Sequence, residues 1–125
     1  MKGGAVLFDV ERRTLAGRPA LTVRGELDLA TAPGLETAAE EVLAGPAGEL
    51  VVDLTDTAFL DSSGARTLLR LARRADQAGV RLHVLAPRSN GPVRLTIDLL
   101  DLGAYVSLVS AAAELPAVLD GDTGA

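Results

Sequence analysis

The sequence predicts an α/β domain in which helices cross a mixed β-sheet, with the element order β-β-α-β-α-β-α-β-α. Three observations carry this prediction. The first segments alternate apolar and polar residues at every second position, and later segments alternate short apolar runs with helical periodicity. Gly or Pro separates most of them. Strands and helices that alternate after an opening hairpin favour crossover connections within one sheet.

The length and composition indicate one domain. The chain of 125 residues is expected to fold as a single unit over residues 1–125, with its core at about 6–119 and short tails. Hydrophobic residues make up 48% of the chain, but these include only two Phe, one Tyr and no Trp. We therefore expect a core of Leu, Val, Ile and Ala, which suits helices packed on a sheet.

Charge and cysteine content exclude several classes of function. A net charge of -5 argues against sequence-independent binding of nucleic acid, which depends on Lys and Arg neutralising phosphates. The absence of cysteine excludes disulfides and thiolate metal sites. The N-terminus lacks the apolar run of a signal peptide, and no apolar stretch approaches the ~20 residues that span a bilayer. We expect a soluble cytoplasmic protein without cofactor or metal.

The first two elements are predicted to form an antiparallel hairpin. Val6 to Glu11 alternates in the manner of a strand, and Ala20 to Gly25 alternates in the same way. The segment between them, Arg12 to Pro19, contains Gly17 and is predicted to be a turn.

Helical periodicity begins after Thr31. Apolar residues then recur at spacings of three and four, so an amphipathic helix is predicted, with Thr31 as its cap and Pro33 in its first turn. Gly45-Pro46 ends this helix. Glu49 to Leu54 contains a short apolar run, which is typical of a central strand covered on both faces.

The second half of the chain continues the alternation. A second helix is expected from just after Gly64 to Gly79. The remaining expected elements are a strand at Val80–Val84 closed by Pro87, a helix from near Asn90 to Gly103, a strand at Tyr105–Val109, a short helix at Ala111–Leu119 and a frayed tail at Asp120–Ala125.

The run Asp61-Ser62-Ser63-Gly64 at the start of the second helix is the candidate site. Capping of the first turn by a serine hydroxyl explains one serine and leaves the other unexplained. Gly64 just inside a helix costs ~1 kcal/mol, and a glycine lets another molecule approach the backbone closely. A helix N-terminus also favours a phosphate, which adds about -1.5 to -2 charges beside Asp61 and near Asp28 and Asp56. A partner matched to the unmodified surface would then be repelled.

Two motifs at these positions resemble a known family. Phe59-Leu60-Asp61-Ser62-Ser63-Gly64 follows the strand Val51-Val52-Asp53-Leu54, and Gly25-Glu26-Leu27-Asp28 precedes it. This pattern resembles the STAS domains of bacterial anti-sigma factor antagonists, and the element order matches from about Val6 to Leu119. The resemblance implies a STAS-type sheet and partner switching, as in the control of sporulation and the stress response.

In such a switch the unmodified antagonist binds an ATP-dependent anti-sigma factor serine kinase of histidine-kinase-like fold, and the sigma factor is released. Phosphorylation reverses the binding, and a serine phosphatase restores the active form. The resemblance implies that Ser62 is the phosphate acceptor. Residues expected at or near the partner surface are Asp28, Thr31, Asp61, Ser63, Gly64 and Arg66, the last because it lies one turn from the serines.

One residue departs from the family pattern, and the resemblance leaves a second function open for the whole domain. Ala65 stands where the family commonly has a larger aliphatic residue after the glycine, which would alter the contact surface without removing the acceptor. Related STAS domains serve stress-sensing and transport complexes, so the alternative is a scaffold or ligand-binding module that is never phosphorylated.

Two enzymatic or phosphorelay interpretations are weaker. A receiver domain phosphorylated on Asp53 needs a lysine near the phosphoryl group, and the only lysine is Lys2. A serine hydrolase needs a base beside Ser62, whereas the single histidine, His83, lies within a predicted strand and is expected to be structural. The arginines of the second helix are expected to form a solvated face, with Arg66 as the exception.

Overall fold

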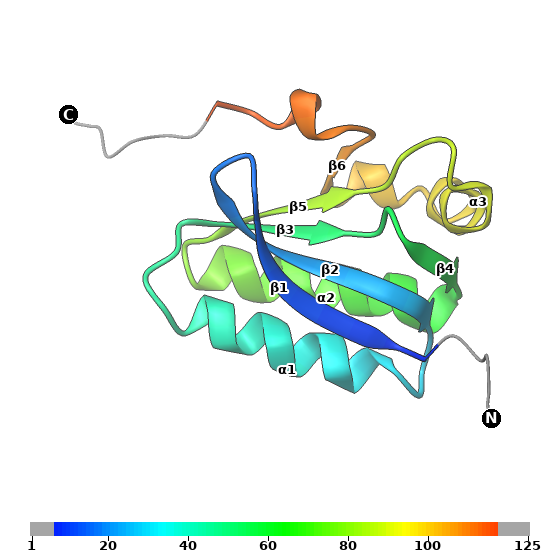
Figure 1. Ribbon diagram of the computed structural model, residues 1–125, viewed down its shortest axis with the longest axis horizontal. Helices are drawn as coiled ribbons and strands as arrows, with labels where there is room; N and C mark the ends of the chain where they lie inside the picture. Colours follow the sequence, from blue (N-terminus) through cyan, green and yellow to red (C-terminus); the bar gives the residue numbers. More distant parts are fainter. Residues whose placement is uncertain (1–6, 118–125) are drawn as a thin grey trace.

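The computed structural model describes residues 7–117, which form a layered α/β fold (Figure 1). The elements in chain order are β1 (Asp9–Leu15), β2 (Arg18–Leu27), α1 (Ala32–Leu43), β3 (Glu49–Asp53), β4 (Thr57–Leu60), α2 (Ser62–Gln77), β5 (Arg81–Leu85), α3 (Gly91–Leu99), the 3-10 turn Leu102–Ala104, β6 (Ser107–Val109) and the 3-10 turn Ala112–Glu114.

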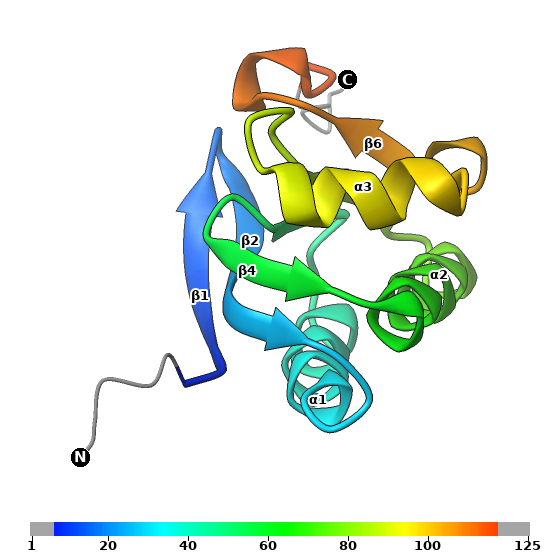
Figure 2. The ribbon, with the colours of Figure 1, turned by 90° about the vertical axis from the view of Figure 1, so that its right-hand side faces the viewer.

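The sheet is mixed, as the sequence predicts. β1 runs antiparallel to β2, and the parallel strands follow in the order β2-β3-β5-β6. β4 lies off this path and pairs in parallel with the last part of β2. On the side away from β1, β2 therefore has two partners. Ala20–Thr22 pair with β3, whereas Gly25–Leu27 pair with β4, which lies beside the end of β2 in Figure 2.

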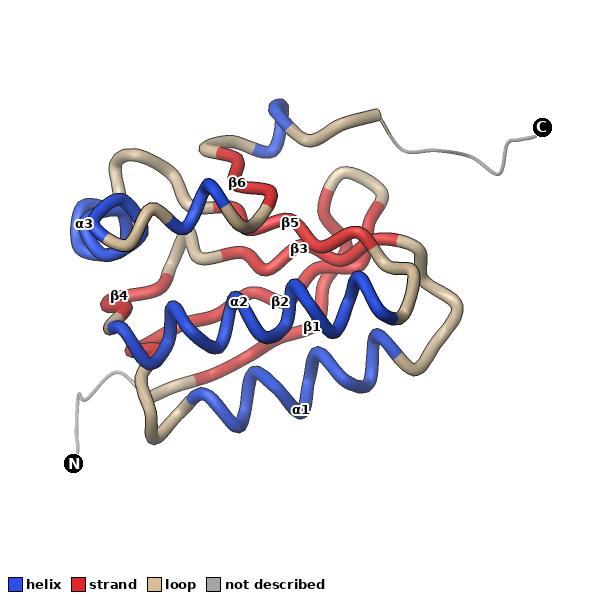
Figure 3. Tube along the Cα trace, turned by 180° about the vertical axis from the view of Figure 1, so that it is seen from behind, coloured by secondary structure: helices blue, strands red, loops and turns tan. Residues whose placement is uncertain are grey.

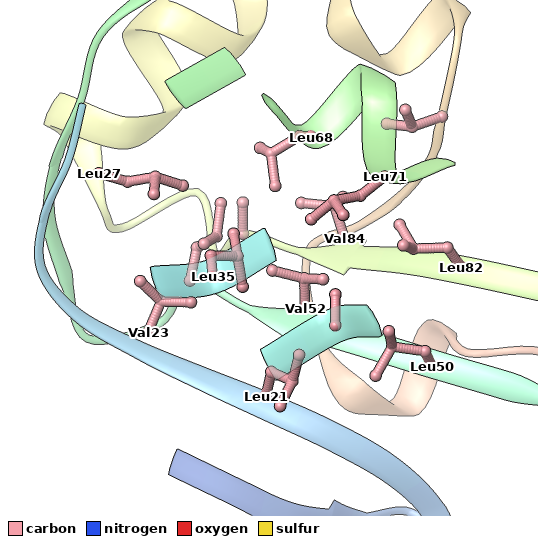
Figure 4. Close-up of a cluster of buried hydrophobic side chains, with 14 of the residues drawn as sticks. Leu21, Val23, Leu27, Leu35, Leu50, Val52, Leu68, Leu71, Leu82 and Val84 are labelled. Carbon is pink, nitrogen blue, oxygen red and sulfur yellow. The ribbon is translucent and has the colours of Figure 1, made fainter. Parts of the chain in front are cut away.

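Two helices cover one face of the sheet. α1 and α2 lie side by side on that face (Figure 3), whereas α3 lies beside β4 (Figure 2). The core between the sheet and these helices is aliphatic, as the composition predicts (Figure 4). Burial of each such side chain contributes about 1.5–3 kcal/mol to stability. The fully or almost fully buried residues include Leu21, Val23, Leu35, Leu50, Val52, Leu68, Leu71 and Val84.

The opening hairpin is confirmed, but its turn is much shorter than expected. β1 extends to Leu15 and β2 begins at Arg18, so only Ala16 and Gly17 form the turn. Both have positive φ, 51° and 80°, which is the backbone of a tight two-residue hairpin turn. The prediction of a turn over Arg12–Pro19 was wrong because the polar residues of an exposed edge strand do not show the alternation of a half-buried one.

β4 was not predicted. No strand was expected between Leu54 and the second helix, but Thr57–Leu60 forms a strand of 4 residues. The Thr57 hydroxyl also donates a hydrogen bond of 2.7 Å to the carbonyl oxygen of Val23. A strand this short has too few residues to display a period, and its pairing with β2 is a contact between distant parts of the chain.

The elements after β5 also differ in extent from the prediction. α3 ends at Leu99 rather than Gly103, because Asp101 adopts a left-handed conformation with φ 53° and a 3-10 turn follows. In place of a helix from Ala111, the structure has only the 3-10 turn Ala112–Glu114. The end of that expected helix and the expected tail lie outside the described residues.

The second face of the sheet contains a buried ionic cluster. Arg18 Nε donates to Glu49 Oε1 at 2.5 Å, and both side chains are buried. His83 is also buried, with Nδ1 2.8 Å from Ser107 Oγ and Nε2 3.7 Å from Glu49 Oε2. Burial lowers the pKa of His83 below its ordinary value of 6.5, and the Glu49 carboxylate only partly opposes this. These contacts agree with the structural role expected for His83.

The buried imidazole predicts a pH-dependent stability. Because the pKa of His83 is lower in the folded than in the unfolded chain, protonation favours unfolding as the pH falls through about 6.5. Urea denaturation at about pH 7.5 and about pH 5.5 should show a larger loss of unfolding free energy in the wild type than in His83→Gln. Equal losses in the two proteins would contradict this role of His83.

Candidate functional site

The two polar segments singled out in the sequence lie next to each other. The backbone N-H of Asp61 donates a hydrogen bond of 3.3 Å to the carbonyl oxygen of Leu27. β4 causes this proximity, because its pairing sets Leu60 beside Leu27 at the end of β2. The start of α2 and the loop from β2 to α1 therefore form one continuous edge of the molecule (Figure 2).

Asp61 caps α2. Its side-chain Oδ1 accepts a hydrogen bond of 2.8 Å from the N-H of Gly64, and its carbonyl oxygen accepts one of 2.9 Å from Ala65. A serine hydroxyl was the expected cap, and the aspartate makes the capping hydrogen bond instead. Capping therefore explains neither serine.

Ser62 and Ser63 stand at the exposed tip of the helix. Ser62 is exposed and Ser63 is half-buried. Within residues 7–117, neither hydroxyl has a hydrogen-bond partner, and the backbone N-H groups of both serines have no acceptor. The tip thus presents two hydroxyls together with two free N-H groups at the positive end of the helix dipole, an arrangement that favours an anion.

Gly64 is buried, and its role is packing within the chain. A Cβ atom at this position would lie 2.3 Å from the carbonyl oxygen of Leu27 and 2.7 Å from Leu60 Cδ1. The close approach to the Gly64 backbone, expected from another molecule, is therefore made by the end of β2. Without a side chain at Gly64, the first turn of α2 can lie directly against that strand end.

Asp28 and Thr31 organise the neighbouring loop. Asp28 Oδ1 accepts hydrogen bonds from the N-H groups of Ala30 at 3.0 Å and Thr31 at 3.1 Å. The Thr31 hydroxyl accepts from the N-H of Asp28 at 3.0 Å and lies 2.7 Å from the carbonyl oxygen of Glu26. Thr31 occupies the cap position of α1, as predicted, but its side chain makes no capping hydrogen bond. Its hydroxyl closes the loop instead.

The arginines of α2 differ in their partners. Arg70 and Arg74 make ion pairs with Glu36 and Glu40 of α1 at 3.2 and 2.7 Å, so part of the expected solvated face bridges the two helices. Arg66, one turn from the serines, is exposed and has no ion pair with any residue in the range 7–117. It is therefore available at the edge of the site.

Three other acidic or basic residues lie apart from the helix tip. Asp56 is at the opposite end of β4 from Ser62, so it does not flank the serines as the sequence analysis proposed. Asp53 accepts hydrogen bonds from the N-H and hydroxyl of Thr55, which identifies it as a turn residue. His83 contacts Glu49 and Ser107 rather than Ser62.

The described part of the chain contains neither a cluster of metal-binding side chains nor a helix that could span a membrane. In residues 7–117 there is no group of three or more His, Cys, Asp or Glu side chains suited to holding a metal ion. None of the helices in that range combines the length and apolar character needed to cross a bilayer.

Comparison with known proteins identifies the family and agrees with the fold. The family model described as "Mlab, STAS domain" matches residues 11–112. An anti-sigma-F factor antagonist, RsfB of Mycobacterium tuberculosis, is 39% identical over 70 residues, which are 56% of this chain and 57% of that relative. The chain thus aligns with little more than half the length of this relative.

Solved structures show the same fold. The crystal structure of an anti-sigma factor antagonist from Mycobacterium paratuberculosis matches with a TM-score of 0.65 and 29% identity, covering 86% of this chain and 87% of that one. The anti-sigma factor antagonist SpoIIAA in its unphosphorylated form matches with a TM-score of 0.61 and 19% identity, covering 86% of this chain and 92% of that one.

The packing at Gly64 predicts a local sensitivity to substitution. Gly64→Ala forces a methyl group toward the Leu27 carbonyl and should lower the free energy of unfolding by about 1–3 kcal/mol. Gly48→Ala is the matched control, because a Cβ atom there meets nothing within 4 Å. Urea denaturation of both variants should show a loss for Gly64→Ala alone, and equal stability of the two would contradict the packing role.

The cap on α2 predicts a second effect. Asp61→Ala removes the acceptor of the Gly64 N-H and should cost about 1 kcal/mol of stability. Asp61→Asn keeps an oxygen acceptor of the same reach and should stay close to the wild type. Thermal unfolding of the three proteins distinguishes them, and a similar loss in both variants would show that charge rather than capping matters there.

Proposed function

The chain belongs to the STAS domain family, and from this premise we propose that it is an anti-sigma factor antagonist controlled by phosphorylation of Ser62. Unmodified, it binds an anti-sigma factor serine kinase, an ATP-binding protein of histidine-kinase-like fold, and so releases a sigma factor. Phosphorylated, it no longer binds. The relatives named above are antagonists of anti-sigma factors, which is a binding role rather than catalysis.

The observation that carries the proposal is the exposed Ser62 hydroxyl at a helix tip whose cap is provided by Asp61. A hydroxyl without a capping task can be modified without loss of a hydrogen bond that stabilises the fold. The free N-H groups of Ser62 and Ser63 and the helix dipole then favour the added phosphate. The modified chain is therefore expected to remain folded.

Phosphorylation is expected to prevent docking through charge and hydration. The phosphate adds about -1.5 to -2 charges directly beside Asp61. A partner that packs against the neutral hydroxyl would have to remove the water around the phosphate before it could pack in the same way. Removing this water is costly when no group on the partner replaces the lost hydration. Each 1.4 kcal/mol of such cost weakens binding about tenfold.

The proposed partner surface surrounds the helix tip. Asp28 and Thr31 shape the loop beside the tip, and Asp61 and Ser63 flank the acceptor. Arg66, which has no ion pair within residues 7–117, supplies a positive charge one turn away. Gly64 contributes indirectly, because it allows the tip to lie against the end of β2. A serine phosphatase is the expected partner that restores the unmodified form, and the cytoplasm is the expected location. No cofactor, nucleic acid or membrane is required.

Incubation with a purified anti-sigma factor kinase and ATP tests the acceptor. The anti-sigma-F factor opposed by the mycobacterial relative is the first protein to test as that kinase. Mass spectrometry should locate one phosphate on Ser62, and Ser62→Ala should abolish the modification whereas Ser63→Ala should retain it. Phosphate only on Ser63, or on no residue, would refute the assignment.

Binding measurements on the same proteins test the switch. Isothermal titration calorimetry with that kinase should give similar affinities for the wild type and Ser62→Ala without ATP, and a loss of at least tenfold for Ser62→Asp. With ATP present, Ser62→Ala should resist release. If Ser62→Asp binds as well as the wild type, a STAS scaffold that is never phosphorylated is the better interpretation.

A further inference from the structure

Three arginines of α2 lie in one row along the helix. Arg66, Arg70 and Arg74 follow one another at a spacing of four residues. Ser62 is four residues before Arg66, so the same row begins at the proposed phosphate acceptor. Side chains four residues apart are neighbours on the surface of a helix. We call this set of four residues the α2 row.

The later arginines of the α2 row have partners on α1, which lies beside α2 (Figure 3). Arg70 pairs with Glu36 at 3.2 Å, and Arg74 pairs at 2.7 Å with a glutamate four residues further along α1. The two helices therefore run in parallel and advance together. One turn earlier, this spacing sets Ala32 level with Arg66, and an alanine carries no charge. The series of ion pairs between the helices stops at Arg66 for this reason.

Arg66 is free to pair with a group at the tip of its own helix. Its side chain is exposed and has no ion pair within residues 7–117. Side chains in a helix lean toward the N-terminus, so the long stem of Arg66 leads back toward Ser62. Asp61 precedes Arg66 by five residues, which is not a neighbouring position, and it directs Oδ1 to the N-H of Gly64.

From this row we infer that Arg66 is the counter-ion, within the same chain, of a phosphate on Ser62. The inference rests on the proposed function and adds a second residue to its switch. A guanidinium offers a planar pair of N-H donors that matches two phosphate oxygens. An anion placed four residues before a cation is also the favourable order of such a pair on a helix.

The pair changes what the tip presents to the anti-sigma factor. In the unmodified chain, Arg66 is an unpaired positive charge on the proposed partner surface. In the phosphorylated chain, the phosphate engages this charge, so a partner carboxylate that contacts Arg66 loses its counter-charge. One modification would then remove an attraction and add a repulsion at the same place.

Titration of the phosphate by phosphorus NMR tests the pair. Phosphoserine is incorporated in place of Ser62 during translation, so the test does not depend on any kinase. The chemical shift of the phosphorus is then followed from about pH 5 to about pH 8, a range that spans the second ionisation of a phosphoserine. The full chain is compared with variants at two exposed arginines of α2, neither of which is a packed side chain.

A neighbouring cation favours the doubly charged phosphate and so lowers its pKa. The midpoint for the chain with Arg66 should lie at least about 0.3 pH units below that of Arg66→Gln. Arg66→Lys keeps the charge and should also titrate below Arg66→Gln. Arg73→Gln is the matched control, because Arg73 is exposed, has no ion pair within residues 7–117 and lies seven residues beyond Arg66. It should leave the midpoint unchanged.

Two results would overturn the inference and leave the proposed function untouched. The first is an equal midpoint with and without Arg66. The second is a shift in Arg73→Gln as large as that in Arg66→Gln, because the effect would then come from the charge of the whole helix. The kinase assay described above decides separately whether Ser62 is phosphorylated, so its failure would refute the proposed function without altering the titration.

Discussion

The contact between the first turn of α2 and the end of β2 is the constraint on which the candidate site depends. Gly64 permits it, because any side chain would collide with the Leu27 carbonyl oxygen at 2.3 Å. The same carbonyl oxygen accepts a hydrogen bond from the N-H of Asp61. A helix that begins so close to a strand end has its tip at the rim of the sheet, where Ser62 is exposed beside the loop held by Asp28 and Thr31.

The division of tasks among four consecutive residues gives this tip its chemical character. Asp61 caps the helix, and Gly64 lets the helix pack against the end of β2. The two serines between them have neither role. In the proposed switch, stability and regulation would therefore depend on different side chains. The Thr96 hydroxyl also ties α3 to this region, because it donates a hydrogen bond to the carbonyl oxygen of Leu60 in the strand that leads into the site.

The other end of the sheet contains the buried ionic cluster of Arg18, Glu49 and His83. A charge pair of this kind stabilises the fold only when its geometry and hydrogen bonds offset the cost of dehydration. Within residues 7–117, Arg18 Nη2, Glu49 Oε2 and His83 Nε2 have no hydrogen-bond partner, so that cost is only partly offset. Arg70 and Arg74 form half-exposed ion pairs with α1, and pairs of this kind contribute little to stability. Arg66 and Arg73 lack such a pair within residues 7–117, and of these two Arg66 is the one a single turn from the serines.

Local patterns alone determined the central strands, the three helices, the aliphatic core and the polar run at the start of α2. These patterns are the alternation of strands, the spacing of helices and the Gly or Pro boundaries, which are all properties of neighbouring residues. Tertiary structure decided the rest. β4, the two-residue hairpin turn and the pairing that brings Leu60 to Leu27 depend on contacts between distant segments. The reason why position 64 is glycine follows from that packing, since the atom that a side chain would meet belongs to Leu27. The cap on α2 is a local contact between Asp61 and Gly64, but only the structure shows that the aspartate rather than a serine makes it.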